Sequence, residues 1–135
     1  MKFHHIGVVA DSIRTGINYF ETSLPKMSTS IAIKDPELAV EVCFLEDSSG
    51  LRFEIIAPLT SESPIMNALG KRQNILNHLA YSDSDFEEKL VALRRNGHIP
   101  LGPPKPAVAF DGSRVVFLLS PLGFILELIE EVGQL

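Results

Sequence analysis

Two stretches that lie 73 residues apart, GLRFEII at residues 50–56 and GFILELI at residues 123–129, repeat one pattern. Each begins with a glycine, continues in mostly apolar residues typical of a strand, and carries one glutamate at the same place, Glu54 or Glu127. A carboxylate among apolar neighbours is costly to bury unless it meets a cation or hydrogen-bond donors. The two stretches therefore predict equivalent strands whose glutamates have partners elsewhere in the chain.

The same offset of 73 residues superimposes the two halves of the chain, so the sequence is one motif written twice. The matched pairs include Phe3 with Leu76, His5 with His78, Ile13 with Phe86, Ile17 with Leu90, Phe20 with Leu93, and Phe44 with Phe117. Ile13, Ile17 and Phe20 have the spacing of one helix face, and their matches repeat it.

In each half we predict a strand, a helix and a group of strands that ends in a hairpin. In the first half these are a strand at 3–10, a helix capped by Asp11 or Ser12, and a hairpin of 40–45 with 51–57. In the second half they are a strand at 75–81, a helix that starts at a Ser84–Glu87 capping box and ends at Asn96–Gly97, and a hairpin of 115–119 with 124–130.

A short additional strand is expected before each hairpin, at 29–34 and at 98–101, which gives β-α-β-β-β twice. Between the halves, Ser63–Pro64 predicts the start of a short helix that Gly70 closes, and the proline-rich stretch 100–106 predicts a surface loop. The prediction is one α+β domain over residues 1–135. Module one spans about 1–60, a connector about 61–73, and module two about 74–131.

Composition excludes several classes of protein. The chain has 135 residues, of which 45% are hydrophobic and 21% charged, as in an ordinary globular domain. A net charge of -5 and the lack of a basic run argue against a nucleic-acid partner. No stretch approaches the roughly 20 apolar residues of a membrane span, and the start lacks the apolar segment of a signal peptide. Cys43 is the single cysteine, which predicts a buried structural thiol, and we expect a cytoplasmic protein.

Four polar residues interrupt the strand patterns at equivalent positions: His5 matches His78, and Glu54 matches Glu127. If the modules pack about a pseudo-twofold axis, two imidazoles and two carboxylates meet at one point. This set balances the charge of a divalent cation and suits Mn, Fe, Co, Ni or Zn better than Ca or Mg. The competing interpretation is that each residue is structural, with Arg52 and Arg114 pairing the carboxylates. His4 and His98 have no such match and are expected at the surface.

The chain resembles the vicinal-oxygen-chelate superfamily, also called the glyoxalase and bleomycin-resistance fold, and within it the methylmalonyl-CoA epimerases. The resemblance rests on five motifs: HIGV at 5–8, EIIAPL at 54–59, SPI at 63–65, NHLA at 77–80 and LELIE at 126–130. It implies two βαβββ modules that form one cup-shaped mixed sheet around a metal site. It also implies that His5, Glu54, His78 and Glu127 are the metal ligands.

The resemblance further implies a metal-dependent epimerase or isomerase that moves an α-proton through a metal-stabilised enolate. Glu127 and Glu41 are the candidate acid/base residues, and the substrate is expected to be a small molecule, either an acyl-CoA or another thioester or a hemithioacetal. Homodimers are common on this fold, so a homodimer is expected. Asn77 stands where epimerases often have a second histidine, and the last turn, SPLGF at 120–124, also departs from their pattern.

Three alternatives stay open. A lactoylglutathione lyase of the glyoxalase I type uses the same four ligands and related chemistry. An iron-dependent extradiol dioxygenase fits less well, because its chemistry needs two histidines and one carboxylate. A metal-free antibiotic-binding protein of the same fold would have no reason to keep four ligand-type residues at matched positions.

Overall fold

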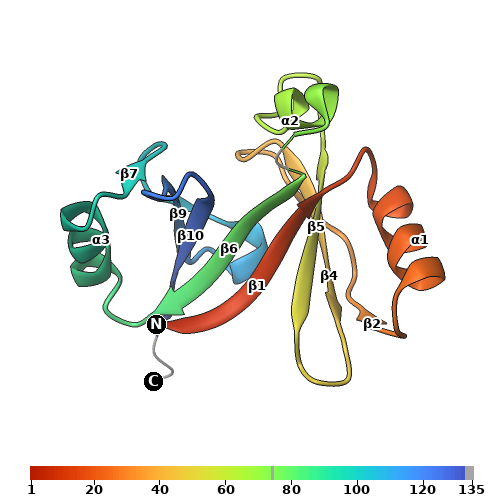
Figure 1. Ribbon diagram of the computed structural model, residues 1–135, viewed down its shortest axis with the longest axis horizontal. Helices are drawn as coiled ribbons and strands as arrows, with labels where there is room; N and C mark the ends of the chain where they lie inside the picture. The colour runs from red at the N-terminus through yellow and green to blue at the C-terminus, as the bar shows by residue number, and fades with distance from the viewer. Residues whose placement is uncertain (74, 133–135) are drawn as a thin grey trace. The chain divides into compact units, whose positions relative to one another are not determined.

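The computed structural model describes residues 1–73 and 75–132, and in that part of the chain it has three α-helices and ten strands (Figure 1). The strands pair both in parallel and in antiparallel, so the predicted α+β class with a mixed sheet is confirmed. The chain packs as two compact units, one formed by His5–Asn77 and the other by Met1–His4 together with the residues from His78 onward. None of the described helices is long and apolar enough to span a bilayer.

The unit of residues 5–77 is a layer of strands in the order β2-β4-β5-β1, with β3 pairing β4. Its elements are β1 (Lys2–Val9), α1 (Ile13–Ser23), β2 (Ser28–Thr29), β3 (Ile33–Asp35), β4 (Val40–Glu46), β5 (Arg52–Pro58) and α2 (Met66–Lys71). β1 runs parallel to β5, and the other pairs are antiparallel. The single strand predicted at 29–34 is therefore two shorter ones on either side of a break.

Helix α1 begins where the sequence predicts, because the Ser12 side chain accepts a hydrogen bond from the Thr15 backbone N–H at 3.0 Å. It lies beside β4 and β5 and packs its apolar face against them (Figure 1). The core between helix and strands is made of Ile13, Phe20, Cys43, Leu45, Ile55 and Ala57. Gly16 allows the close approach, since a Cβ there would lie 2.6 Å from Ile55 Cγ2.

The hairpin of β4 and β5 turns at Asp47–Gly50, as predicted. The Asp47 carboxylate accepts hydrogen bonds from the backbone N–H groups of Ser49 and Leu51, and Gly50 takes a positive φ of 90°. This turn sets the register in which Phe44 lies directly opposite Glu54. The glutamate therefore projects from the same face of the hairpin as the phenylalanine.

The sequence correctly predicted a short helix between the two halves, but both of its predicted ends were wrong. α2 begins at Met66 rather than at Ser63–Pro64, and Gly70 lies within it. Arg72 ends the helix in the left-handed conformation, with φ of 50°, and its guanidinium pairs with Asp11 at 3.2 Å. The stop signal was misassigned because a non-glycine residue takes the left-handed position at the helix end.

The second unit repeats the arrangement with the strand order β6-β10-β9-β7 and with β8 pairing β9. Its elements are β6 (Leu76–Asp83), α3 (Phe86–Arg95), β7 (Ile99–Pro100), β8 (Lys105–Pro106), a 3₁₀ turn at Val108–Phe110, β9 (Arg114–Leu119) and β10 (Ile125–Glu130). β6 runs parallel to β10, and α3 packs on β10 over a core of Phe86, Val116, Leu118 and Leu128.

Charged contacts tie this unit together at its edges. Arg114 binds Glu130 at 2.6 Å and Glu87 at 2.7 Å, and its guanidinium lies 4.8 Å from the centre of the Phe86 ring. The amino group of Met1 pairs with Asp83 at 2.9 Å. The arginine thus links strand β9 to both β10 and the start of α3.

Two predictions for this unit were wrong. The capping box does not form, because the cap of α3 is Asp85, one residue after Ser84, and the Asp83 carboxylate binds the Asp85 N–H at 2.7 Å. The stretch 100–106 is not wholly a loop, since β7 and β8 add short pairings to β9. Proline is tolerated there because both strands pair on one side only.

Candidate metal centre

The first buried pair consists of His5 on β1 and Glu54 on the neighbouring parallel strand β5. His5 Nε2 lies 3.4 Å from Glu54 Oε1, and the two residues are 0% and 6% exposed. The ring of Phe44, opposite Glu54 on β4, packs edge-on against the His5 imidazole with centroids 5.3 Å apart. A buried histidine and a buried carboxylate thus face each other, with a phenylalanine ring against the imidazole.

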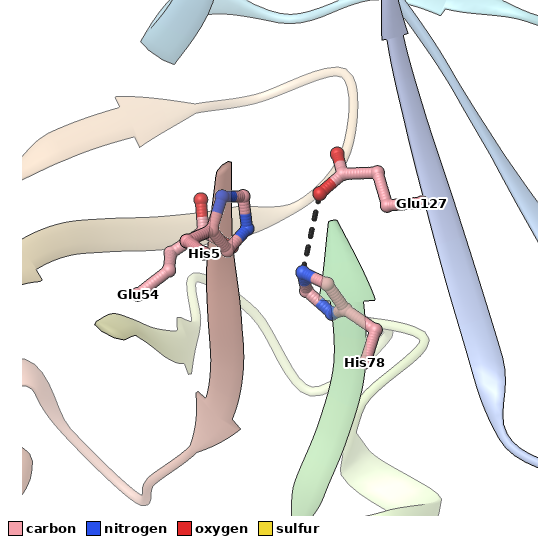
Figure 2. Close-up of side chains that lie close together, drawn as sticks. All are labelled: His5, Glu54, His78 and Glu127. Atoms are coloured by element: carbon pink, nitrogen blue, oxygen red, sulfur yellow. Dashed lines mark ion pairs between the residues drawn. The ribbon is translucent and has the colours of Figure 1, made fainter. Parts of the chain in front are cut away.

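The second buried pair has the same construction. His78 on β6 and Glu127 on the parallel strand β10 approach to 3.1 Å between Nε2 and Oε1, the contact dashed in Figure 2. They are 4% and 3% exposed. Phe117 lies directly opposite Glu127 and packs edge-on against His78 with centroids 5.4 Å apart.

The pairs are equivalent in register as well as in residue type. Glu54 lies beside Gly7 in the parallel pairing of β1 with β5, and Glu127 lies beside Ala80 in that of β6 with β10. Gly7 and Ala80 differ by the same 73 residues as the two glutamates. The two halves of the sequence therefore repeat the same strand register, and in that register the same histidine, glutamate and phenylalanine positions.

The donor chemistry of these pairs fits a divalent transition metal. Neutral imidazole and carboxylate are ligands for Zn, Mn, Fe, Co and Ni, and burial leaves little water to solvate the carboxylates. A buried carboxylate needs a cation or donors, and a neutral histidine supplies only one N–H. Each pair could therefore contribute two ligands to a metal ion. Within the described residues, His5, Glu54, His78 and Glu127 form a group that could hold such an ion.

Glu41, the other predicted catalytic residue, is placed differently. It alternates with Val42 and Phe44 on β4, and it lines a groove of about 830 Å³ with Ile13 and Arg14 of α1. Glu41 therefore projects toward the helix, while Glu54 and Phe44 project from the opposite face. The structure does not bring Glu41 to the His5–Glu54 pair.

The remaining predicted residues have structural roles. Cys43 is buried, its thiol donates to the Ser30 carbonyl at 3.2 Å, and burial raises the pKa of this thiol. His4 packs edge-on against Phe110, and His98 Nδ1 lies 3.1 Å from the Leu93 carbonyl, so both are partly buried rather than wholly at the surface.

The arginines proposed as structural partners do not pair with the buried glutamates. Arg114 binds Glu130 and Glu87, and Arg52 forms no ion pair within residues 1–73 and 75–132. Sequence reasoning did not identify the phenylalanines that pack against the histidine rings as part of the site. Their signal was present, since Phe44 and Phe117 match at the same offset as the ligands.

Comparison with known proteins identifies the family of the chain. The model of the glyoxalase/bleomycin resistance protein/dioxygenase superfamily matches residues 4–117. The uncharacterized protein YqjC of Bacillus subtilis (strain 168) is 30% identical over 98% of this chain and 94% of its own length.

Among solved structures, a hypothetical protein from Bacillus halodurans C-125 is 29% identical, with a TM-score of 0.83 over 99% of this chain and 96% of that one. The methylmalonyl-CoA epimerase from Mycobacterium tuberculosis has a TM-score of 0.80 over 98% of this chain and 89% of that one, and at 23% identity it shows a shared fold. The chain therefore belongs to the glyoxalase/bleomycin resistance protein/dioxygenase superfamily, the family that its internal repeat and motifs predicted.

Proposed function

We propose that His5, Glu54, His78 and Glu127 together hold one divalent transition-metal ion, and that the protein is an isomerase that moves a proton α to a thioester carbonyl. The observation that carries this proposal is the occurrence of two buried His–Glu pairs with equivalent strands, register and aromatic support. Two structural ion pairs would need no such equivalence. The substrate that we propose is a 2-carboxyacyl thioester of the methylmalonyl-CoA kind, supported by the shared fold with an epimerase of that name.

When bound, the metal would supply a Lewis acid that makes the α-carbon proton easier to remove. The chain itself supplies the proton carriers. Glu127 is the proposed base that takes the α-proton, because a carboxylate that uses one oxygen as a ligand keeps a second for proton transfer. Since Glu41 projects toward α1, Glu54 is the carboxyl group of the other unit to which we assign the return of a proton. It would carry that proton before the step, on the oxygen that does not hold the metal, and Glu127 would carry the abstracted proton afterwards and lose it to solvent.

The apolar surroundings of the pairs favour this chemistry. Phe44 and Phe117 cover one side of each histidine, which limits the access of water to the carboxylates. Exclusion of water protects the carbanionic species from stray protonation. The phenylalanines also fix the imidazole rings, which preserves ligand geometry between turnovers.

The first experiment measures transition-metal content by mass spectrometry on untagged wild-type protein, Glu127→Ala and Glu41→Gln. Near one equivalent is expected in the wild type and in Glu41→Gln, with a sharp loss in Glu127→Ala. Glu41→Gln is the control, because it removes a carboxylate from a strand of the same fold, on the face that projects toward α1 and away from the His5–Glu54 pair. A wild-type protein that stays empty after incubation with Co, Ni, Mn and Zn would refute the proposal and favour metal-free binding of a small molecule.

The second experiment follows exchange of the α-proton of methylmalonyl-CoA in deuterated water, with the metal-loaded protein. Exchange is expected in the wild type and in Glu41→Gln, and it should fall by at least about 100-fold in Glu127→Gln. Conversion of methylglyoxal that depends on added glutathione, without α-proton exchange in the thioester, would identify a glyoxalase I-type lyase instead. Light scattering of the same samples tests the expected homodimer.

A further inference from the structure

Arg52 begins strand β5 two residues before Glu54, so the alternation of the strand places both side chains on one face. The residue directly opposite Arg52 across the hairpin is Glu46. An arginine opposite a glutamate usually forms an ion pair, since their Cβ atoms lie within reach. Arg52 is therefore a cation on the metal-ligand face, in a place where its ordinary partner is available.

The expected ion pair is nevertheless missing. Among the described residues Arg52 has no ion-pair partner, and its buried Nε atom makes no hydrogen bond. Glu46 turns toward the tip of the hairpin, where its Oε1 lies 3.9 Å from the position that a Cβ on Gly50 would take. A buried guanidinium nitrogen without an acceptor is costly, which points to an acceptor that the chain does not itself supply.

The internal repeat shows that the charge is specific to one module. The position equivalent to Arg52 is Ile125, and the position equivalent to Glu46 is Leu119. Leu119 pairs with Ile99 of β7, and these two side chains are 36% and 60% exposed. The β4–β5 and β9–β10 hairpins thus match at Glu54 and Glu127 but differ two residues earlier, where one unit has a cation and the other an apolar residue.

We infer that Arg52 binds a carboxylate of the substrate and thereby selects anionic substrates over neutral ones of the same shape. The inference rests on the proposed function, because the carboxylate belongs to a molecule that also binds the metal held by the histidine–glutamate pairs. A planar guanidinium offers paired N–H donors that match the two oxygens of a carboxylate. Arg52 is then a specificity residue, and the metal ligands need no help from it to bind the ion.

The test uses two bidentate chelators that differ in one group, butanohydroxamate and succinate monohydroxamate. Each is titrated into cobalt-loaded protein while the visible spectrum of the cobalt is recorded. Wild type is expected to bind the carboxylated probe on the order of tenfold more tightly than the neutral one, the preference that one charge-assisted contact supports. Arg52→Met should lose that preference and bind the neutral probe as well as wild type does.

Two further variants separate charge from general damage. Arg52→Lys keeps the charge without the planar donors and should recover part of the preference. Arg14→Met removes an exposed arginine of α1, on the other face of the strands, and should leave both affinities unchanged.

The outcomes distinguish the two proposals. If the wild-type protein takes up no cobalt, or binds neither of the two chelators, the proposed function is overturned and this inference with it. Cobalt uptake together with an equal preference for the carboxylated probe in wild type and Arg52→Met overturns the inference alone.

Discussion

Gly16 is the position at which a single methyl group should most clearly damage the packing beneath the ligand strands. It lies on the buried face of α1, and an added Cβ would be 2.6 Å from Cγ2 and 3.0 Å from Cδ1 of Ile55. Ile55 is 0% exposed and adjoins Glu54 on β5, so it has no space into which it can move. Gly16→Ala should therefore push the helix away from the strand.

The size of the effect follows from two opposing contributions. Alanine is favoured over glycine within a helix by about 1 kcal/mol. Overpacking of a closely packed core costs about 1–3 kcal/mol, and a contact of 2.6 Å with a fully buried side chain belongs at the upper end. The expected net loss is about 1–2 kcal/mol of unfolding free energy, or about 3–7 °C in Tm for a chain of this length.

The matched control is Gly70→Ala in α2, where an added Cβ meets nothing within 4 Å. The same chemical change should there raise Tm by about 2–3 °C, because only the helix preference acts. Thermal unfolding by circular dichroism and urea titration at 25 °C measure both variants. A Gly16→Ala protein as stable as Gly70→Ala would show that α1 shifts without cost, and the packing argument would be wrong.

Three further expectations concern charges and the thiol. Arg114→Met should lower Tm by less than Gly16→Ala, and the difference from wild type should shrink in 1 M salt, because screening weakens the contacts with Glu87 and Glu130. Cys43 should react with a thiol reagent at least about tenfold more slowly in native than in urea-unfolded protein, since burial raises its pKa and blocks access. An equal rate in both states would contradict this. Hydrogen bonds to Asp47 and the Arg114 contact with Glu130 hold the pKa of each carboxyl below its ordinary value, so the stability they add is present above about pH 4 and is lost as pH falls further. Urea titrations between pH 7 and pH 3 should show a smaller acid loss in Asp47→Asn than in wild type, and an identical loss would refute the assignment.

Much of the fold could be predicted because the repeat gave two readings of each element. The hairpin ending at 51–57 and its match at 124–130 each contain a strand seen in the structure, β5 and β10. The helix cap at Ser12 was recognisable because one serine stands before one apolar helical face. A pattern that indicates a strand or a helix by chance in one half is not expected at the matching position of the other half, so agreement between the halves supports the prediction.

The failures occurred where several residues compete for one structural role. Asp83, Ser84 and Asp85 can all accept hydrogen bonds at the start of α3, and tertiary packing decides among them. The face of Glu41 could not be fixed from sequence, because a shift of one residue in the β4–β5 turn would reverse it. The break between β2 and β3 has a counterpart between β7 and β8, but the two stretches differ in sequence, and the prolines of the second one favoured a loop instead of a strand.

The edge-on contacts of Phe44 with His5 and of Phe117 with His78 bear on timing as well as on geometry. A ring held between a neighbouring strand and an aromatic edge cannot rotate away unless the hairpin beneath it opens. The lifetime of any ion bound by these imidazoles would then follow the opening rate of the β4–β5 and β9–β10 hairpins. Slow hydrogen exchange at the backbone amides of those strands and slow metal release would be two measurements of one motion.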